Sequence, residues 1–259
     1  MKILYLHPAR ESSKRLYPEY YKRVEEIIKK VIRRDTTFEI RLLSEGVPED
    51  DQTLYWYAQP RFFGEMIAVA KKAEKEGFDV AVIGCCGSFP AILGVKEALV
   101  IPVVGAGEAA FHLAQILGHN FAVLTYNRKV AAWCDKIVHY YSLESKCVSI
   151  RPAHTTLMNV FAAGTDVHKA FLEQAKKAID EDRAEVIITL STGQAGVAQY
   201  LRKHLEAPVV DPIEAGVKFA EMLADLNKAT GLIQSRIACY QPSPDTEKFL
   251  KSSYPEVYR

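Results

Sequence analysis

Residues 79–116, DVAVIGCCGSFPAILGVKEALVIPVVGAGEAAFHLAQI, align without a gap on residues 185–222, EVIITLSTGQAGVAQYLRKHLEAPVVDPIEAGVKFAEM, at a constant offset of 106. In this alignment Gly87 falls on Gly193, and Cys85 falls on Ser191. Each copy begins with an apolar run typical of a buried strand, followed by a turn of small residues, a helix, a second short strand and another helix. The repeat predicts two equivalent α/β halves facing one cleft, with a thiol in one turn and a hydroxyl in the other.

The rest of the chain alternates in the same way. Strands are expected at 2–7, 38–46, 121–126 and 147–153, and helices at 17–34, 61–76, 129–141 and 166–182. Such alternation predicts βαβ units and mainly parallel sheets. Residues 154–164 are expected to form a longer, mobile connection, and the proline-containing tail after residue 233 is expected to wrap the surface.

Composition excludes several classes of protein. The chain has 259 residues, 49% of them hydrophobic and 25% charged, with a net charge of +1, so it has a sizeable core and no basic footprint for nucleic acid. No apolar run approaches the length needed to cross a bilayer, which predicts no membrane association. The five cysteines lack the spacing of a disulfide or zinc framework, and this favours a reducing, cytoplasmic location.

The two small-residue turns, at 84–90 and 190–196, are the expected site of chemistry. Ligands of parallel α/β sheets bind beyond the carboxyl ends of the strands, where glycines allow close approach and helix amides hold anions. A thiol at a helix start is also biased toward the thiolate form, so Cys85 is the candidate catalytic residue. The alternative is that Cys85 is a packed apolar residue, as many free cysteines are. Cys86 is expected to face the other way along the strand.

The segments VIGCCGSFPA, VKEALVIPVVGAGEAA, PVVDPIEAGVKFAEML and GLIQSRIACYQP resemble the aspartate/glutamate racemase superfamily, in particular its hydantoin and allantoin racemase branch. The resemblance implies two pseudo-symmetric Rossmann-like lobes with the active site in the cleft between them. It places residues 1–107 plus 214–259 in lobe 1 and residues 108–213 in lobe 2. It also implies a cofactor-independent isomerase that removes a proton beside a carbonyl with one cysteine and returns a proton with another.

The resemblance assigns the first cysteine to Cys85, while the second falls on Ser191, as the internal repeat also indicates. A serine hydroxyl is far less acidic than a thiol and needs a neighbouring base. Three mechanisms therefore stay open. Cys85 could act as a single acid/base with His7 or water on the other face, as the sole thiol of an arylmalonate-type decarboxylase, or as the nucleophile of a maleate-isomerase-like enzyme. A small-ligand binding protein with a degenerate site is a further alternative.

The remaining candidates are expected to bind a small carboxylate or cyclic ureide rather than to react. They are His7, Gly87, Ser88, Thr125, Tyr126, Thr192, Gly193 and Gln194. No metal or other cofactor is expected, and the resemblance makes a homo-oligomer plausible.

Overall fold

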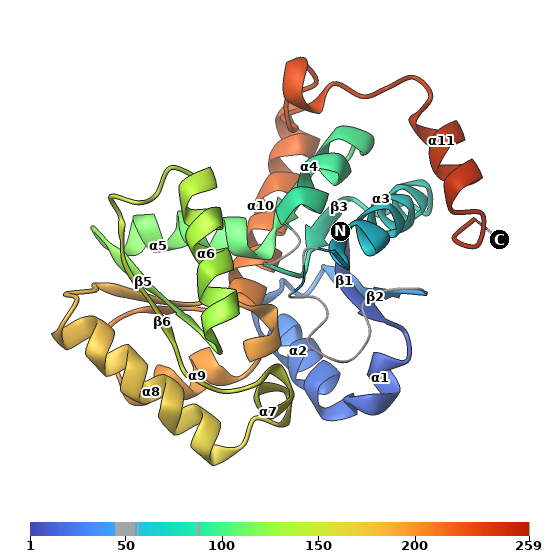
Figure 1. Ribbon diagram of the computed structural model, residues 1–259. Helices are drawn as coiled ribbons and strands as arrows, with labels where there is room; N and C mark the ends of the chain where they lie inside the picture. Colours follow the sequence, from blue (N-terminus) through green and yellow to red (C-terminus); the bar gives the residue numbers. More distant parts are fainter. Residues whose placement is uncertain (45–54, 56, 87–88, 259) are drawn as a thin grey trace. The chain divides into compact units, whose positions relative to one another are not determined.

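The computed structural model describes residues 1–44, 55, 57–86 and 89–258 (Figure 1). The chain divides into two compact units. Unit 1 comprises Met1–Leu16, Val31–Gly105 and Gly216–Arg259, and unit 2 comprises Tyr17–Lys30 and Ala106–Ala215. Residues 17–30 thus belong to unit 2, whereas the sequence-based boundaries place them in lobe 1. No helix among the described residues has the length and apolarity to cross a bilayer.

Unit 1 is built on a four-stranded parallel sheet of order β2-β1-β3-β4. Its strands are β1 (Lys2–Arg10), β2 (Thr37–Leu43), β3 (Val80–Ile83) and β4 (Val103–Gly105). Helices α3 and α4 pack beside one another over this sheet. The helices of the unit are α1 (Ser13–Leu16), α3 (Gln59–Lys75), α4 (Phe89–Ala98) and α11 (Thr246–Ser253), together with most of α10 (Pro212–Thr230). All four β3 residues are buried, as expected of a strand covered on both faces.

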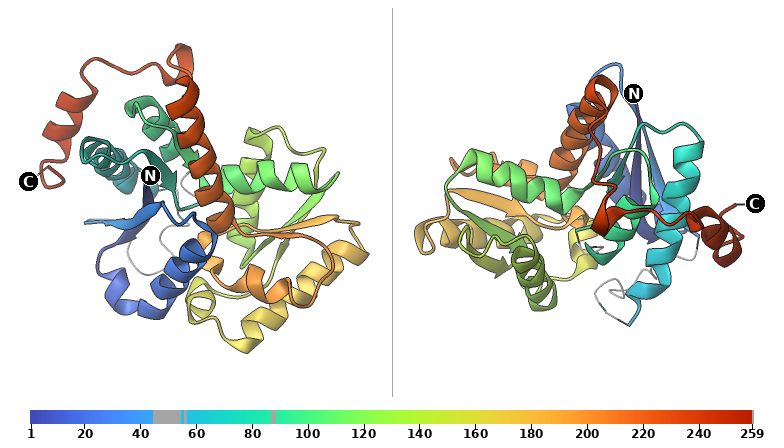
Figure 2. Two further views of the ribbon diagram at one scale, coloured as in Figure 1. Left: turned by 180° about the vertical axis from the view of Figure 1, so that it is seen from behind. Right: turned by 90° about the horizontal axis from the view of Figure 1, so that it is seen from above.

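Unit 2 repeats the same strand order as β6-β5-β7-β8, again parallel throughout. Its strands are β5 (Phe121–Thr125), β6 (Cys147–Pro152), β7 (Val186–Thr189) and β8 (Val209–Val210). Helices α5 and α6 cover one face of the sheet, and α8 and α9 pack together on the other (Figures 1 and 2). The helices of the unit are α2 (Pro18–Val31, as far as Lys30), α5 (Ala106–Leu117), α6 (Arg128–Tyr140), α7 (Leu157–Ala162), α8 (Thr165–Asp180) and α9 (Val197–Leu201). The predicted α/β fold with two parallel sheets is confirmed.

The strand register shows that the internal repeat is structural. In unit 1 the last pair between β1 and β3 is Leu6 with Ile83, and the next amide, that of Gly84, donates to the Leu6 carbonyl oxygen over 2.8 Å. In unit 2 the last pair between β5 and β7 is Leu124 with Thr189, and the Leu190 amide donates to the Leu124 carbonyl oxygen over 3.0 Å. The same register places His7 of β1 at the position that Thr125 occupies in β5.

Two segments differ from the sequence-based expectation. Residues 154–164 contain the short helix α7, whose first turn is capped by the Thr156 hydroxyl accepting from the Asn159 amide. The tail includes the short helix α11, which the sequence pattern did not predict. Both helices are shorter than the ten or more residues over which helical periodicity becomes distinct from a loop, so the pattern did not reveal them.

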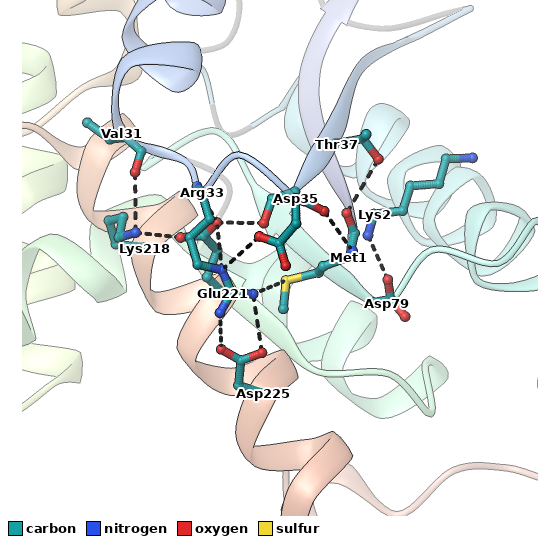
Figure 3. Close-up of polar contacts among 11 residues, drawn as sticks. Met1, Lys2, Val31, Arg33, Asp35, Thr37, Asp79, Lys218, Glu221 and Asp225 are labelled. Atoms are coloured by element: carbon teal, nitrogen blue, oxygen red, sulfur yellow. Dashed lines mark hydrogen bonds and ion pairs between the residues drawn. The ribbon is translucent and has the colours of Figure 1, made fainter.

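Helix α10 is anchored in unit 1 by a buried carboxylate (Figure 3). The Glu221 side chain, 4% exposed, accepts hydrogen bonds from the Arg33 amide at 2.9 Å and from the Thr36 hydroxyl at 2.7 Å. Lys218, one turn earlier, forms an ion pair with the same carboxylate. Burial alone would raise the pKa of Glu221, but these hydrogen bonds lower it overall. The α10 position is therefore fixed against the segment that joins α2 to β2.

A second buried carboxylate marks the start of α10. Asp211 is 2% exposed and follows β8 directly. One carboxylate oxygen accepts from the Ile213 amide at 2.7 Å, and the other accepts from Gln199 Nε2 at 2.9 Å. Burial, and next the charge of Glu214, raise the pKa of Asp211 from the ordinary 3.8 to about 6.

This raised pKa predicts a pH-dependent stability. The folded state holds the Asp211 proton more tightly than the unfolded chain does, so the free energy of unfolding should fall as pH rises from about 4 to above 6. The shift corresponds to a loss of up to about 3 kcal/mol. Urea unfolding between pH 4 and pH 7 measures it. Asp211→Asn keeps an oxygen for the Ile213 amide and cannot ionise, so the wild-type decline should exceed that of the variant. Parallel curves for the two proteins would refute the assignment.

Candidate active site

The turn after β3 presents Cys85 at the carboxyl end of the unit 1 sheet. Strand β3 ends at Ile83, so Cys85 and Cys86 both lie in the turn, both half-buried, and the expected strand alternation does not apply to them. The chain requires a glycine at position 84, just before this turn, because a Cβ there would lie 2.3 Å from Cε1 of the buried Tyr5 ring. Two other predicted site residues in this turn, Gly87 and Ser88, lie outside the described residues.

His7 lies at the same edge of the unit 1 sheet. It follows Leu6, the last β1 residue paired with β3, and lies where the pairing of β1 with β2 shifts register. Burial lowers the pKa of His7 to about 4, so the imidazole is neutral near pH 7. Its Nδ1 accepts a hydrogen bond from the Ala9 amide at 3.3 Å. The proton of the neutral ring is therefore on Nε2, which makes the imidazole a hydrogen-bond donor rather than a base.

The equivalent turn of unit 2 begins with Ser191. The residue is half-buried in an extended conformation and starts a single 3-10 turn, η2 (Thr192–Gln194). Its Oγ accepts a hydrogen bond from the Gly193 amide at 3.2 Å. With one lone pair engaged by an N–H donor, the hydroxyl is better suited to donate its proton than to abstract one.

The other predicted site residues of unit 2 are buried around this turn. Thr125 is fully buried, and its hydroxyl lies beside the Cys134 thiol. Gln194, 1% exposed, donates from Nε2 to the Leu124 carbonyl oxygen over 3.4 Å and so ties η2 to the end of β5. Thr192 and Tyr126 are also buried. These buried side chains are thus placed to support the backbone of the turn, and Ser191 is its half-buried hydroxyl.

Two further thiols are poorly suited to ionise. Burial raises the pKa of Cys134 far above the ordinary value, and burial raises the pKa of Cys147 to about 12. Cys134 lies on α6, beside Thr125, and Cys147 lies on β6. Burial therefore weighs against these two thiols, whereas Cys85 and Cys86 are half-buried and Cys239 is exposed.

The structure brings the candidates together in two groups. Cys85 and His7 share the carboxyl edge of the unit 1 sheet, and Ser191, Thr192, Gly193 and Gln194 share that of unit 2 with Thr125 and Tyr126. That both groups serve one substrate stays a prediction of the sequence repeat. Sequence reasoning missed Tyr20, whose hydroxyl reaches the unit 2 turn, because its spacing marks it only as a core residue of a helix.

Comparison with known proteins identifies the family of this chain. Residues 18–220 match the model of the Asp/Glu/Hydantoin racemase family. A hydantoin racemase of Pseudomonas sp. strain NS671 is 35% identical over 173 residues, covering 66% of this chain and 68% of that protein. A hydantoin racemase of Paenarthrobacter aurescens is 33% identical over 174 residues, covering 66% of this chain and 72% of that protein.

Solved structures extend the similarity over nearly the whole fold. The allantoin racemase from Klebsiella pneumoniae superposes with a TM-score of 0.81 at 21% identity, covering 94% of each chain. The allantoin racemase from Pseudomonas fluorescens gives 0.78 at 25% identity, covering 94% of this chain and 97% of the other. Arylmalonate decarboxylase, at 16% identity with a TM-score of 0.59 and 86% and 92% coverage, shares the fold alone. Since the family match spans most of the sequence, this chain belongs to the Asp/Glu/hydantoin racemase family and is an isomerase of the racemase type.

Proposed function

We propose that the protein racemises a small cyclic ureide, such as a 5-substituted hydantoin, by moving the proton on the ring carbon beside a carbonyl. The observation that carries this proposal is the position of Cys85, at the carboxyl end of β3 in a chain of the racemase family. The proteins it resembles are named hydantoin and allantoin racemases, which supports a cyclic ureide over an open-chain acid.

Cys85 is the proposed base. Its thiolate takes the proton from the carbon, and the electron pair left behind is delocalised into the adjacent carbonyl as an enolate. A proton returned to the opposite face of that carbon gives the mirror-image product. The thiol then loses its proton to solvent and the cycle closes, so the reaction needs no oxidant, reductant or cofactor.

His7 and Ser191 are proposed to act through hydrogen bonds. The neutral His7 ring, with its proton on Nε2, suits stabilisation of the enolate oxygen, where negative charge develops. Ser191 is too weak an acid and base to act alone, so we assign it the relay of a proton from water to the second face. Its Oγ already accepts from the Gly193 amide, which favours donation of its own proton.

The proposal is tested by incubating the enzyme in D₂O with one enantiomer of a 5-substituted hydantoin or of allantoin. Proton NMR follows the loss of the ring C–H signal, and circular dichroism follows the loss of optical activity. Both should fall together, well above the rate with heat-denatured enzyme. Enzyme-dependent racemisation without deuterium incorporation would contradict the proposal, and so would the absence of acceleration with both the hydantoin and allantoin. Release of CO₂ from disubstituted malonates would instead indicate a decarboxylase.

Ser191→Cys tests the role of the second turn. A thiol has a pKa of about 8.5 and exchanges protons directly, so we expect the variant to racemise about 10-fold faster than wild type. Initial rates at saturating substrate measure the change in kcat. Ser191→Ala is the matched control, since it removes the relay without supplying a thiol, and it should be slower than wild type. A Cys variant no faster than the Ala variant would show that the group at 191 does not limit turnover.

A further inference from the structure

A tyrosine from the N-terminal region reaches the Ser191 turn. Tyr20, on the buried face of α2, is 1% exposed. Its hydroxyl donates a hydrogen bond to the Thr192 carbonyl oxygen over 3.2 Å, across 172 positions of sequence. Its ring stacks on Phe161 of α7, with centroids 4.3 Å apart and an interplanar angle of 27°. The phenol is therefore held in place by packing while its oxygen is aimed at the turn.

The hydrogen bond acts on one particular peptide group. The Thr192 carbonyl and the Gly193 N–H are the two ends of one planar unit and point in opposite directions. The carbonyl end accepts from Tyr20, and the N–H end donates to Ser191 Oγ at 3.2 Å. The Tyr20 hydroxyl, this peptide and the Ser191 hydroxyl thus form one continuous hydrogen-bonded chain.

We infer that Tyr20 is a positioning residue for the racemase reaction, which orients the Ser191 hydroxyl through the Thr192–Gly193 peptide. Donation to the carbonyl fixes the peptide plane and polarises it, so that the N–H becomes a stronger donor to Ser191 Oγ. A more firmly engaged Oγ keeps its own proton directed away from the turn. The assignment of a catalytic consequence rests on the proposed function of Ser191, but the structural coupling does not.

The surrounding packing leaves the peptide little room to rotate. A Cβ on Gly193 would lie 2.9 Å from Leu157 Cδ1 and 3.3 Å from Phe161 Cε1, so α7 closes on the turn from one side. Arg23, one turn after Tyr20 on α2, donates to the Phe161 carbonyl oxygen and so joins α2 to α7. Helices α2 and α7 therefore act as one support for η2.

The coupling is tested without any substrate. Selective ¹⁵N labelling of the 14 glycines gives a simple amide spectrum, in which Ser191→Ala identifies the Gly193 signal. Tyr20→Phe removes one oxygen and retains the stacked ring. We expect it to shift the Gly193 amide signal upfield and to speed its hydrogen exchange about 3- to 10-fold. Tyr140→Phe, at an exposed tyrosine of α6, should leave that signal unchanged.

A second variant keeps the test decisive should Tyr20→Phe fold poorly. Incorporation of 3,5-difluorotyrosine at position 20 makes the phenol a stronger donor and should shift the Gly193 amide downfield. An unchanged Gly193 signal in a folded Tyr20→Phe protein, or in the fluorinated protein, would overturn the inference.

The catalytic consequence is tested by a double-mutant cycle. If Tyr20 acts through Ser191, Tyr20→Phe should lower kcat about 3- to 10-fold in the wild-type background and have no effect in the Ser191→Ala background. An equal loss in both backgrounds indicates a general structural role and contradicts the positioning role. Absence of racemisation in the wild type would count against the proposed function alone, because the amide measurement reports on the coupling independently.

Discussion

Replacing Cys85 with alanine is expected to lower kcat for racemisation by at least about 10²-fold, with little change in KM. Positioned proton transfer contributes about 10²–10⁴-fold to a reaction of this kind, and the substitution removes the base while leaving the turn backbone in place. Exchange of the substrate C–H in D₂O should fall by the same factor, since the same group takes the proton. The measurement is the initial rate of both processes on one hydantoin enantiomer, with thermal unfolding to verify the fold.

Cys86→Ala is the matched control for this prediction. Cys86 follows Cys85 in the same turn and is also half-buried, so its replacement measures the general effect of removing a thiol from this turn. We expect the kcat of Cys86→Ala to stay within about 2-fold of wild type, because the proposed mechanism gives Cys86 no role. A Cys85→Ala enzyme as fast as the Cys86→Ala enzyme would remove Cys85 from the mechanism.

The second large effect is expected at Gly84. A Cβ there would lie 2.3 Å from Tyr5 Cε1 and 2.6 Å from Tyr5 Cζ, far closer than atoms can approach. The Tyr5 ring is 1% exposed within the core, so the backbone before Cys85 has to move. We expect Gly84→Ala to lower the free energy of unfolding by about 1–3 kcal/mol. Displacement of Cys85 by the same shift should reduce kcat by up to about 10²-fold.

Urea unfolding and kcat measure the two effects, and the chain offers both a control and a rescue. Gly164, the N-cap of α8, has no atom within 4 Å of its would-be Cβ, so Gly164→Ala meets no clash and should cost less stability than Gly84→Ala. In unit 2 the position equivalent to Gly84 holds Leu190, and the position equivalent to Tyr5 holds the smaller Val123. A larger residue can therefore fit at position 84 when the residue at position 5 is small. Tyr5→Val should therefore restore part of the stability of Gly84→Ala. A Gly84→Ala protein with wild-type stability and kcat would disprove the steric role of Tyr5.

The repeat explains why so much of the fold was predictable. The apolar runs in residues 79–116 and 185–222 are features of the local sequence. Strands, turns and helices form in both units where these runs predict them. The assignment of residues 17–30 to unit 2 was not predictable, because an amphipathic helix shows that it packs but not against which sheet. The short helix α7 was missed for a related reason, since its position depends on packing against η2 more than on its own propensity.

The candidate site was likewise predictable from the sequence only in part. The positions of Cys85 and Ser191 just after buried strands could be predicted, because both strands are visible as apolar runs in the sequence. Their roles stay a prediction. The protonation state of His7 could not be predicted, because it depends on burial and on the Ala9 amide. The hydrogen bond from Tyr20 was equally hidden, since it joins residues 172 positions apart and only the folded chain brings them together.

That separation has a consequence for how the molecule is made. Residues 17–30 leave the ribosome well before the rest of the unit they complete, and the last part of that unit, up to Ala215, arrives nearly two hundred residues later. Contacts of such high sequence separation form slowly, since the intervening loop has to close first. The apolar face of α2, with Tyr20, Tyr21, Val24, Ile27 and Ile28, therefore stays without its native cover during most of synthesis. Until β8 has emerged, we expect this apolar face to favour non-native association of the nascent chain.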